Sequence, residues 1–366
     1  MRKALTPLVQ LSRSPEINQA KQVYQKIGSF DKNHVIEWLK AYWHNRIGRK
    51  HPFQTWKTHS GIFKFNNTAK ISLAGDWGTG TDEAFEVGQQ IKASNPDYTI
   101  HLGDVYYVGD TTEVEENFLG GKHGIYSPVN WPTGKYGEFA LSGNHEMFAR
   151  GFGYFDTLLP AMSIVDGLKS VKQEASYFCL ENDYWRVIGL DTAYNSIGWP
   201  ILENISSPKC DLTQEQLDWL YQTVQPYKDT KATILLTHHQ YYSAFENQYK
   251  AAASQLSMLF HKPVLWFWGH EHRLAVYDKY NLDNLEAYGR CIGHGGMPIE
   301  INCKIKNKDV LLLFTDNRAY PNDEGLHIGY NGFVNLTFDT YNLKVDYVDL
   351  KGTIIRTENW YGNTLR

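Results

Sequence analysis

Five short polar runs stand out in the sequence, and each one directly follows an apolar segment of strand length. The runs are Gly75–Gly78 (GDWG), Gly103–Tyr107 (GDVYY), Gly143–Glu146 (GNHE), Thr237–Gln240 (THHQ) and Gly269–His272 (GHEH). The carboxyl ends of strands in an open α/β sheet form the crevice in which ligands bind. We therefore expect one rim of the fold to collect nine side chains: Asp76, Asp104, Tyr107, Asn144, His145, His238, His239, His270 and His272.

These side chains have the chemistry of a metal centre. Carboxylate and amide oxygens together with imidazole nitrogens are ligands of Zn, Fe and Mn. Taken singly, an aspartate after a strand is usually a turn or cap residue, and a lone histidine is usually a core or surface group. His270 and His272 are two residues apart, so on an extended segment they face opposite sides and could reach two adjacent ions. The five runs in this order predict a metal centre.

Strands and helices alternate in the part of the chain that carries these runs. We expect strands at Lys70–Ala74, Tyr98–Leu102, Glu138–Leu141, Trp185–Leu190, Thr233–Leu236 and Val264–Trp268, and helices at Glu83–Lys92 and Gln214–Val224. The second helix opens with a capping-box arrangement at Thr213–Gln216. Further strands are expected at Val310–Phe314, Phe333–Phe338, Lys344–Asp349 and Thr353–Arg356. This pattern indicates an α/β protein with two packed sheets.

The first part of the chain has a different pattern. Glu16–Ile27 and Asn33–Ile47 carry apolar residues at helical spacing. We therefore expect an N-terminal helical extension over residues 1–66 and a catalytic domain over residues 67–366.

Composition excludes several classes of protein. The chain has 366 residues and a formal net charge of −4, which argues against coating of nucleic acid or of an anionic membrane. No apolar stretch approaches the ~20 residues of a membrane span, and the N-terminus lacks the apolar core of a secretory signal. The four cysteines form no CxxC pair, so free thiols and a cytoplasmic location are expected.

The ordered runs resemble the motifs of the calcineurin-like metallophosphoesterase superfamily over roughly residues 69–300. Within it, the chain is most similar to the purple acid phosphatases. Most branches begin with Asp-x-His, whereas Asp76 here begins Asp-Trp-Gly. The purple branch carries a tyrosine in a GDxxY arrangement, which Tyr107 matches; Tyr106 is also available but lacks the family spacing. The resemblance implies a four-layer α/β/β/α sandwich of two mixed sheets flanked by helices.

The family's ligand roles can be carried over residue by residue, and Asp104 would then bridge two metal ions. The first ion would be held by Asp76, Asp104, Tyr107 and His272, and the second by Asp104, Asn144, His238 and His270. A tyrosine ligand favours Fe(III) at the first position, with divalent Fe, Zn or Mn at the second. Two such cations would activate a water molecule and stabilise the oxygens of a phosphate ester during hydrolysis.

Two histidines are candidate catalytic residues. The family places a phosphate contact, able to protonate the leaving group, at the position of His145; the other interpretation is that His145 only donates to a neighbouring carboxylate. Family members carry a further histidine nine or ten residues beyond the THHQ-type ligand, where this chain has Asn247 and Gln248. His239 is the candidate substitute, although on a regular strand it would point away from the site.

Four other residues have weaker assignments. Glu146 orients His145 or is solvated, His294 contacts substrate or belongs to a turn, and Asp191 lies at the rim or in a turn. His101, inside the strand, is expected to be a satisfied interior histidine.

The resemblance implies a dinuclear metal-dependent phosphatase that hydrolyses phosphomonoesters by attack of metal-bound hydroxide, with a small-molecule phosphate ester as substrate. A phosphodiesterase or nucleotide pyrophosphatase on the same site is the alternative, because the downstream histidine is missing. A catalytically silent binding module would be expected to lack some of the family's metal ligands, whereas this chain has a residue at all seven ligand positions. A nuclease is disfavoured by the net charge, no membrane partner is expected, and the sequence leaves the oligomeric state open.

Overall fold

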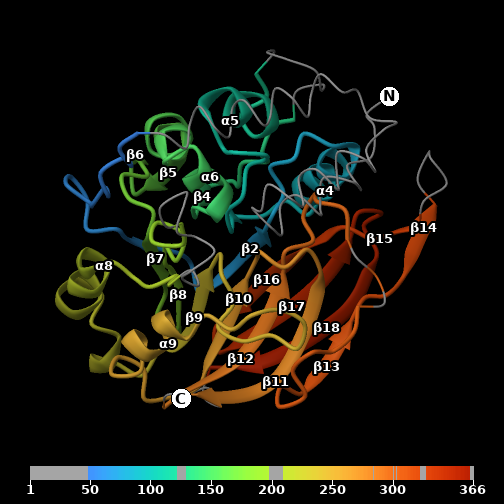
Figure 1. Cartoon of the computed structure of the whole chain (residues 1–366). Coiled ribbons are helices and arrows are strands. Elements are labelled where there is room, and N and C mark those ends of the chain that lie inside the picture. The colour runs from blue at the N-terminus through green and yellow to red at the C-terminus, as the bar shows by residue number, and fades with distance from the viewer. Residues whose placement is uncertain are drawn as a thin grey trace.

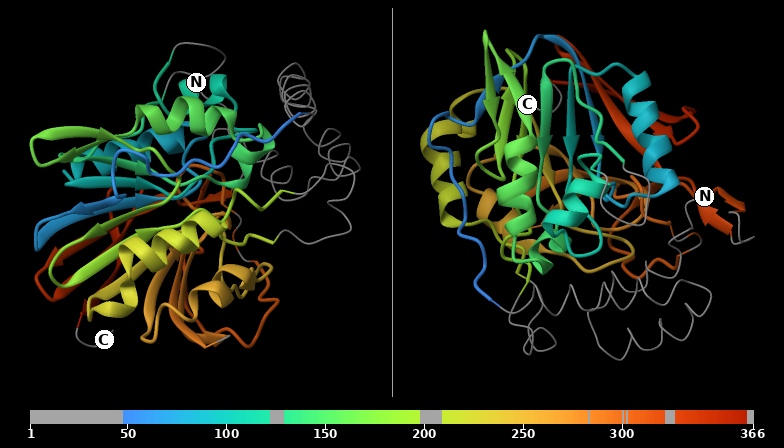
Figure 2. Two further views of the ribbon diagram at one scale, coloured as in Figure 1. Left: turned by 90° about the vertical axis from the view of Figure 1, so that its left-hand side faces the viewer. Right: turned by 90° about the horizontal axis from the view of Figure 1, so that it is seen from above.

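A computed structural model describes residues 48–121, 129–197, 209–282, 284–299, 301, 303–321 and 327–362 of the chain. It confirms the predicted fold class, because two mixed eight-stranded sheets lie face to face with helices on their outer faces (Figure 1, Figure 2). In Figure 1, α4, α5 and α6 lie on one side of the sheet pair, and α8 and α9 lie on the other. Each sheet is therefore covered on both faces.

The first sheet has the strand order β18-β17-β16-β2-β3-β4-β5-β6. Its strands are β2 (Thr68–Ala74), β3 (Tyr98–His101), β4 (Gly137–Ala140), β5 (Ser163–Asp166), β6 (Lys169–Lys172), β16 (Gly332–Asp339), β17 (Asn342–Asp349) and β18 (Ile354–Tyr361). β2, β3 and β4 are parallel neighbours, so their carboxyl ends meet at one edge.

The second sheet has the order β1-β7-β8-β9-β10-β12-β11-β13. Its strands are β1 (Ile62–Lys64), β7 (Phe178–Glu181), β8 (Trp185–Gly189), β9 (Ala232–Thr237), β10 (Val264–Trp268), β11 (Leu274–Leu282), β12 (Leu285–Ile292) and β13 (Leu312–Thr315). β8, β9 and β10 are parallel neighbours. A separate two-stranded sheet pairs β14 (Ala319–Pro321) with β15 (His327–Gly329).

Among the residues that the structure describes, the helical segments are short. They are α4 (Asp82–Ala93), α5 (Thr111–Asn117), α6 (Asn144–Phe148), the π-helix η1 (Gly153–Leu158), α7 (Leu159–Ala161), α8 (Gln214–Trp219), the π-helix η2 (Leu220–Val224), the 3₁₀-helix η3 (Pro226–Lys228) and α9 (Lys250–Leu256). Helix α4 follows β2 directly, and Thr81 caps it by accepting a hydrogen bond from Ala84 N–H.

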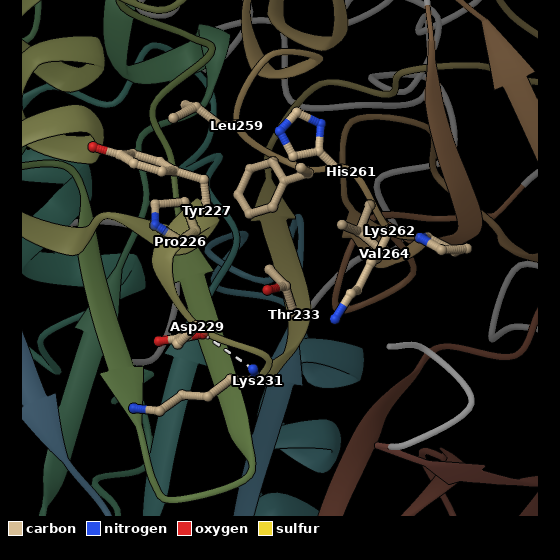
Figure 3. A pocket seen from close by; sticks show the side chains of 11 residues that line it. Pro226, Tyr227, Asp229, Lys231, Thr233, Leu259, His261, Lys262 and Val264 are labelled. Carbon is tan, nitrogen blue, oxygen red and sulfur yellow. Dashed lines mark hydrogen bonds between the residues drawn. The ribbon is translucent and has the colours of Figure 1, made fainter.

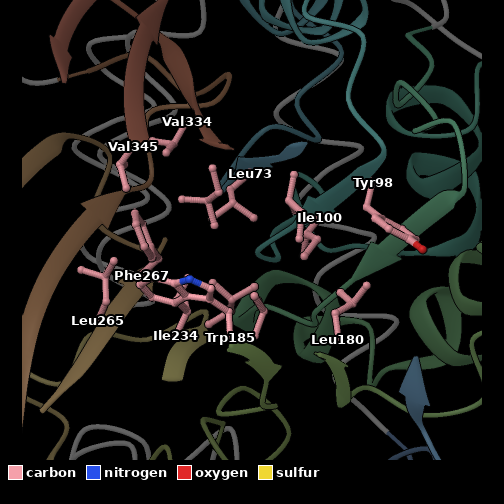
Figure 4. Close-up of a cluster of buried hydrophobic side chains, with 14 of the residues drawn as sticks. Leu73, Tyr98, Ile100, Leu180, Trp185, Ile234, Leu265, Phe267, Val334 and Val345 are labelled. Carbon is pink, nitrogen blue, oxygen red and sulfur yellow. The ribbon is translucent and has the colours of Figure 1, made fainter. Parts of the chain in front are cut away.

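The central core lies between the two sheets, because strand side chains alternate between faces. Leu265 and Phe267 of β10 enter this core, whereas Trp266 and Trp268 pack under the helices of the second sheet. Complete burial of one such side chain contributes about 1.5–3 kcal/mol, so this layer holds the strand ends firmly. Figure 4 shows core residues from both sheets, among them Leu73, Ile100, Val334, Trp185 and Ile234.

Two predictions made for segments outside the site differ from the structure. Residues 1–47 of the predicted helical extension lie outside the described residues, but residues 48–66 contain no helix and include β1, which pairs with β7. The capping box predicted at α8 is wrong, since Thr213 makes no side-chain cap. Gln216 instead bonds both backbone groups of Asp191, with Nε2 donating to its carbonyl at 2.9 Å and Oε1 accepting from its N–H at 2.8 Å. A helix residue thus holds the loop that follows β8.

Candidate metal centre

The five polar runs meet at one edge of the sandwich, as their strand positions require. GDWG, GDVYY and GNHE follow β2, β3 and β4 of the first sheet, and THHQ and GHEH come at the ends of β9 and β10 of the second. Hydrogen bonds join the loops directly. His270 N–H donates to Asp76 Oδ2 at 2.8 Å, and Gly269 N–H donates to the His238 carbonyl at 3.1 Å. The site therefore spans both sheets.

One group of ligand atoms surrounds the hydroxyl of Tyr106. This oxygen lies 2.8 Å from Asp76 Oδ1, 3.1 Å from Asp104 Oδ2 and 3.0 Å from His272 Nε2. His272 Nε2 lies 3.4 Å from Asp76 Oδ1. All four side chains are almost completely buried. Two carboxylates, a phenol and an imidazole thus converge within a few ångströms.

The tyrosine in this group differs from the sequence prediction, which named Tyr107. The main chain explains the difference. Tyr106 N–H donates to the Gly78 carbonyl at 2.9 Å, and the Tyr106 carbonyl accepts from Asn117 Nδ2 at 2.8 Å. Tyr107 N–H donates to Glu113 Oε1 at 2.6 Å. These bonds orient the loop so that the ring of Tyr106 turns toward the carboxylates.

A second group surrounds the amide oxygen of Asn144. Oδ1 lies 3.0 Å from His238 Nε2 and 2.9 Å from His270 Nδ1. Asp104 Oδ2 lies 3.3 Å from His238 Nε2, so Asp104 belongs to both groups. His238 Nδ1 donates to the Leu102 carbonyl at 2.9 Å, which directs Nε2 to the group.

The electrostatics of the two groups favour bound cations. Burial raises the pKa of Asp76 to about 7, and the adjacent Asp104 adds to this rise while His238 opposes it. Burial also disfavours charge on Asp104 and His238, but their attraction holds the pKa of Asp104 well below its ordinary value and raises that of His238 to about 9. The cluster therefore stabilises positive charge. Its mixed oxygen and imidazole donors fit two transition-metal ions.

Three residues of the two groups have a left-handed backbone conformation. The φ angles are 58° at Asp76, 74° at Asp104 and 64° at His270. Non-glycine residues in this region cost about 1–3 kcal/mol each and persist where the surrounding structure holds them. Such strain concentrated at the meeting point of five loops is typical of a functional site.

Two glutamates, the buried Glu146 and the half-buried Glu113, hold the loops in place. Glu146 accepts hydrogen bonds from the N–H groups of Gly143 at 2.8 Å, Val105 at 2.8 Å and Asp104 at 3.2 Å. Burial raises the pKa of Glu146 to about 8, and the nearby Asp104 adds to this rise. The carboxylate therefore joins the GDVYY and GNHE loops, rather than orienting His145 or being solvated.

Glu113 has a similar role in the loop after Tyr107, and the sequence analysis did not single it out. It accepts the N–H groups of Tyr107 at 2.6 Å and of Val108 and Gly109 at 2.8 Å each. Glu113 is the third residue of α5, whose N-cap is Asp110. An acidic residue shortly after a motif loop is the only sequence signal for such a contact.

Both candidate catalytic histidines border the site. His145 Nδ1 lies 2.5 Å from the Tyr107 carbonyl and must donate to it, while Nε2 lies 3.8 Å from Asp104 Oδ2. His239 lies beyond the end of β9, and its ring centroid is 4.6 Å from that of His270. The strand on which His239 would point away ends at Thr237, so strand alternation does not determine the direction of this ring.

The remaining candidates have structural surroundings. The carbonyl of His294 accepts from Asn331 Nδ2 at 3.0 Å and from Gly332 N–H at 2.9 Å, in a loop that packs beneath Asp76. Asp191 Oδ1 accepts from the N–H groups of Ala193 and Tyr194, so it forms a turn. The ring nitrogens of His101 have no hydrogen-bond partner among the described residues, so His101 is interior but not satisfied.

A pocket at the opposite end of the second sheet is separate from this site. It is lined by Thr233 at the start of β9, Val264 at the start of β10, and neighbours such as Tyr227 and His261 (Figure 3). Its volume is about 70 Å³, far below the roughly 300–1,000 Å³ of ordinary ligand sites. It has room for a few water molecules only.

Comparisons with known proteins agree with this geometry. The sequence model of the calcineurin-like phosphoesterase family matches residues 69–274. A solved purple acid phosphatase, PPD1 from yellow lupin (Lupinus luteus) seeds, has a TM-score of 0.54 and 16% identity, over 80% of this chain and 54% of that chain. The chain thus spans about half the length of the lupin protein, and the likeness shows a shared fold.

Two further structures align over 80% of this chain. GAP50, the anchor in the inner membrane complex of Plasmodium, has a TM-score of 0.46 and 14% identity, with 89% of that chain covered. PhoD has a TM-score of 0.48 and 12% identity, with 68% of that chain covered. A comparison with curated protein sequences found no match. Among the residues described, none of the helices combines the length and apolar character that a membrane span requires.

Proposed function

Because the chain belongs to the calcineurin-like phosphoesterase family, we propose that it is a dinuclear metal-dependent phosphatase acting on phosphomonoesters. The observation that carries this proposal is the sharing of Asp104 between two groups of buried ligand atoms. A carboxylate between two such groups can bridge two ions, and phosphatases use paired ions in this way.

The proposed ligands follow the geometry of the two groups. Asp76, Asp104, Tyr106 and His272 would hold the first ion, and Asp104, Asn144, His238 and His270 would hold the second. The phenol supports Fe(III) at the first position, with divalent Fe, Zn or Mn at the second. When bound, two cations supply Lewis-acid activation of water and charge neutralisation of the phosphate ester.

The chain's own residues would orient the substrate. We propose that His145 and His239 contact the phosphate or the leaving group, since both rings border the ligand groups. Burial lowers the pKa of each histidine. Neutral imidazoles at this site would act as hydrogen-bond partners of the substrate. A small-molecule phosphate ester is the proposed substrate, and the four free thiols support a cytoplasmic location.

Parallel assays of p-nitrophenyl phosphate and bis-p-nitrophenyl phosphate test this function. The protein would be loaded with Fe, Zn or Mn, and we expect the monoester to be hydrolysed faster. Preference for the bis ester would instead assign a phosphodiesterase. Asp104→Asn should abolish turnover and lower the content of both ions, whereas Asp309→Asn, at an exposed position, should change neither. Activity that survives in Asp104→Asn would contradict the proposed site.

A further inference from the structure

We propose that Thr192 is a positioning residue that fixes the tautomer of His239, so that Nε2–H of His239 is a hydrogen-bond donor to the phosphate. This inference rests on the proposed phosphatase function and adds a residue to it. It also assigns different roles to three histidines that lie close together in space. One ligand atom each of His238, His239 and His270 lies within 4.8 Å of the other two.

Thr192 contacts His239 at two points. Its Oγ1 lies 3.1 Å from the backbone nitrogen of His239 and 3.1 Å from the ring Nδ1. Both residues are buried, with exposed fractions of 2% and 3%. The backbone of Thr192 is held in turn, because Gln216 bonds both backbone groups of the preceding Asp191. The hydroxyl is therefore fixed relative to the imidazole.

The placement of protons follows from these two contacts. The backbone N–H of His239 can only donate, so Oγ1 of Thr192 accepts there. The hydroxyl proton then needs an acceptor, and among the described residues the recorded contact is Nδ1 of His239. If Nδ1 carried the proton, the buried hydroxyl would keep a donor without an acceptor, which is unfavourable. Nδ1 is therefore the acceptor, and the proton of the neutral ring resides on Nε2.

The rest of the environment fixes the plane of the ring. Tyr249 contacts it edge to face at a centroid distance of 5.3 Å, and His238 does so at 4.9 Å. The His239 carbonyl accepts from Thr237 Oγ1 at 2.8 Å. With its backbone and Nδ1 engaged, the ring can offer only Nε2–H to a ligand at the second group.

This tautomer separates His239 from its neighbours chemically. His238 donates through Nδ1 to a carbonyl, so Nε2 is the atom that it can offer to a cation, as a metal ligand requires. His239 has the opposite tautomer, and a protonated Nε2 cannot bind a cation but can donate to a phosphate oxygen. Asn247 and Gln248 occupy the positions where a downstream histidine was expected, so His239 supplies the imidazole donor from a different place in the sequence.

Nitrogen NMR of the zinc-loaded, ¹⁵N-histidine-labelled protein near neutral pH tests the tautomer directly, because zinc is diamagnetic. The His239 signals would be identified by their loss in His239→Gln. We expect a protonated Nε2 and an unprotonated Nδ1 in the wild type and in Thr192→Ser, and a mixture of tautomers in Thr192→Val. A wild-type signal with the proton on Nδ1, or with Nε2 bound to zinc, would overturn the proposal without any need for a variant.

Kinetics give the second measurement. Thr192→Val should raise KM for p-nitrophenyl phosphate about tenfold with kcat changed little, because a ground-state hydrogen bond to a charged group is weakened, and Thr192→Ser should restore KM. An unchanged KM in a folded Thr192→Val protein would overturn the positioning role and leave the phosphatase function standing. A wild type with the expected tautomer but no hydrolysis of any phosphate ester would overturn the phosphatase function and support the assignment of His239.

Discussion

The hydroxyl of Tyr106 lies 2.8 Å from Oδ1 of Asp76, although the two residues follow different strands of the first sheet. The same hydroxyl lies 3.0 Å from His272 Nε2, which follows a strand of the second sheet. Burial and the two neighbouring carboxylates raise the pKa of Tyr106 well above its ordinary value. A phenol held in this way among carboxylates would ionise on binding a strongly charged cation.

Tyr106→Phe should therefore remove the visible charge-transfer band expected of a phenolate on ferric iron and should lower the iron content. The ring packing is retained in this variant, so the fold should persist. Tyr107→Phe is the matched control, because it removes the neighbouring hydroxyl, and it should keep the colour. The visible spectrum and elemental analysis of the purified proteins measure both effects. Loss of colour in Tyr107→Phe but not in Tyr106→Phe would instead identify Tyr107 as the ligand, as the sequence predicted.

Gly143→Ala should weaken the binding of both metal ions without straining the backbone at residue 143. Gly143 has φ of −110°, which alanine adopts readily, but an added Cβ would overlap with Oδ1 of Asp104 and lie 2.6 Å from its backbone nitrogen. The shared carboxylate must move, and we expect metal affinity to fall by about 10–100-fold. Chelator competition followed by circular dichroism measures affinity and folding separately. Gly362→Ala is the control, since its nearest atoms are 3.5 Å away, and equal affinities in the two variants would contradict the argument.

The strands that carry the site were predictable because their apolar runs are continuous and each is followed by polar residues, with a glycine in front of them in four of the five runs. Val264–Trp268 was predicted with its observed bounds, since it is a buried parallel strand with no polar residue. Strand β1 was missed because three residues paired with β7 leave no periodicity to detect. Pattern reasoning thus located the loops but not every strand between them.

The choice between Tyr106 and Tyr107 depended on contacts that no spacing rule contains. Glu113 binds the backbone N–H of Tyr107, and the Gly78 carbonyl binds that of Tyr106, and together these bonds set which ring faces inward. The direction of the His239 ring could not be predicted for a related reason, because β9 ends at Thr237 and strand alternation stops there. Side-chain direction in a loop is set by partners distant in sequence.

Glu113→Ala should destabilise the loop after Tyr107, because three backbone N–H groups lose their acceptor. Each unsatisfied group costs about 1–3 kcal/mol where water cannot replace the carboxylate. Because Glu113 is only half-buried, water can satisfy part of the three groups, and we expect the free energy of unfolding to fall by about 2–4 kcal/mol. Urea unfolding measures this change. Glu86→Ala removes an exposed glutamate from α4 and should change stability by less than about 0.5 kcal/mol. A loss in Glu113→Ala no larger than in the control would show that water satisfies these groups.

His101, which is not one of the proposed metal ligands, gives the protein a dependence of stability on pH. Its ring lies between Phe118 and Trp131, at centroid distances of 5.0 and 5.2 Å, and burial lowers its pKa to about 3. An unfolded histidine has a pKa of about 6.5, so the unfolded chain binds the proton first as pH falls. The stability contributed by the neutral ring is therefore present above about pH 6.5 and is lost progressively below it.

His101→Phe should remove this dependence, because phenylalanine fills the same aromatic site without titrating. Between about pH 7 and about pH 5 we expect the variant to lose about 2 kcal/mol less free energy of unfolding than the wild type. At neutral pH it should be more stable by about 1 kcal/mol, since two buried nitrogens without hydrogen bonds are removed. Urea unfolding at both pH values measures the difference, with His261→Gln, at an exposed position, as the control. Parallel pH curves for wild type and His101→Phe would mean that the ring is solvated or protonated in the folded protein.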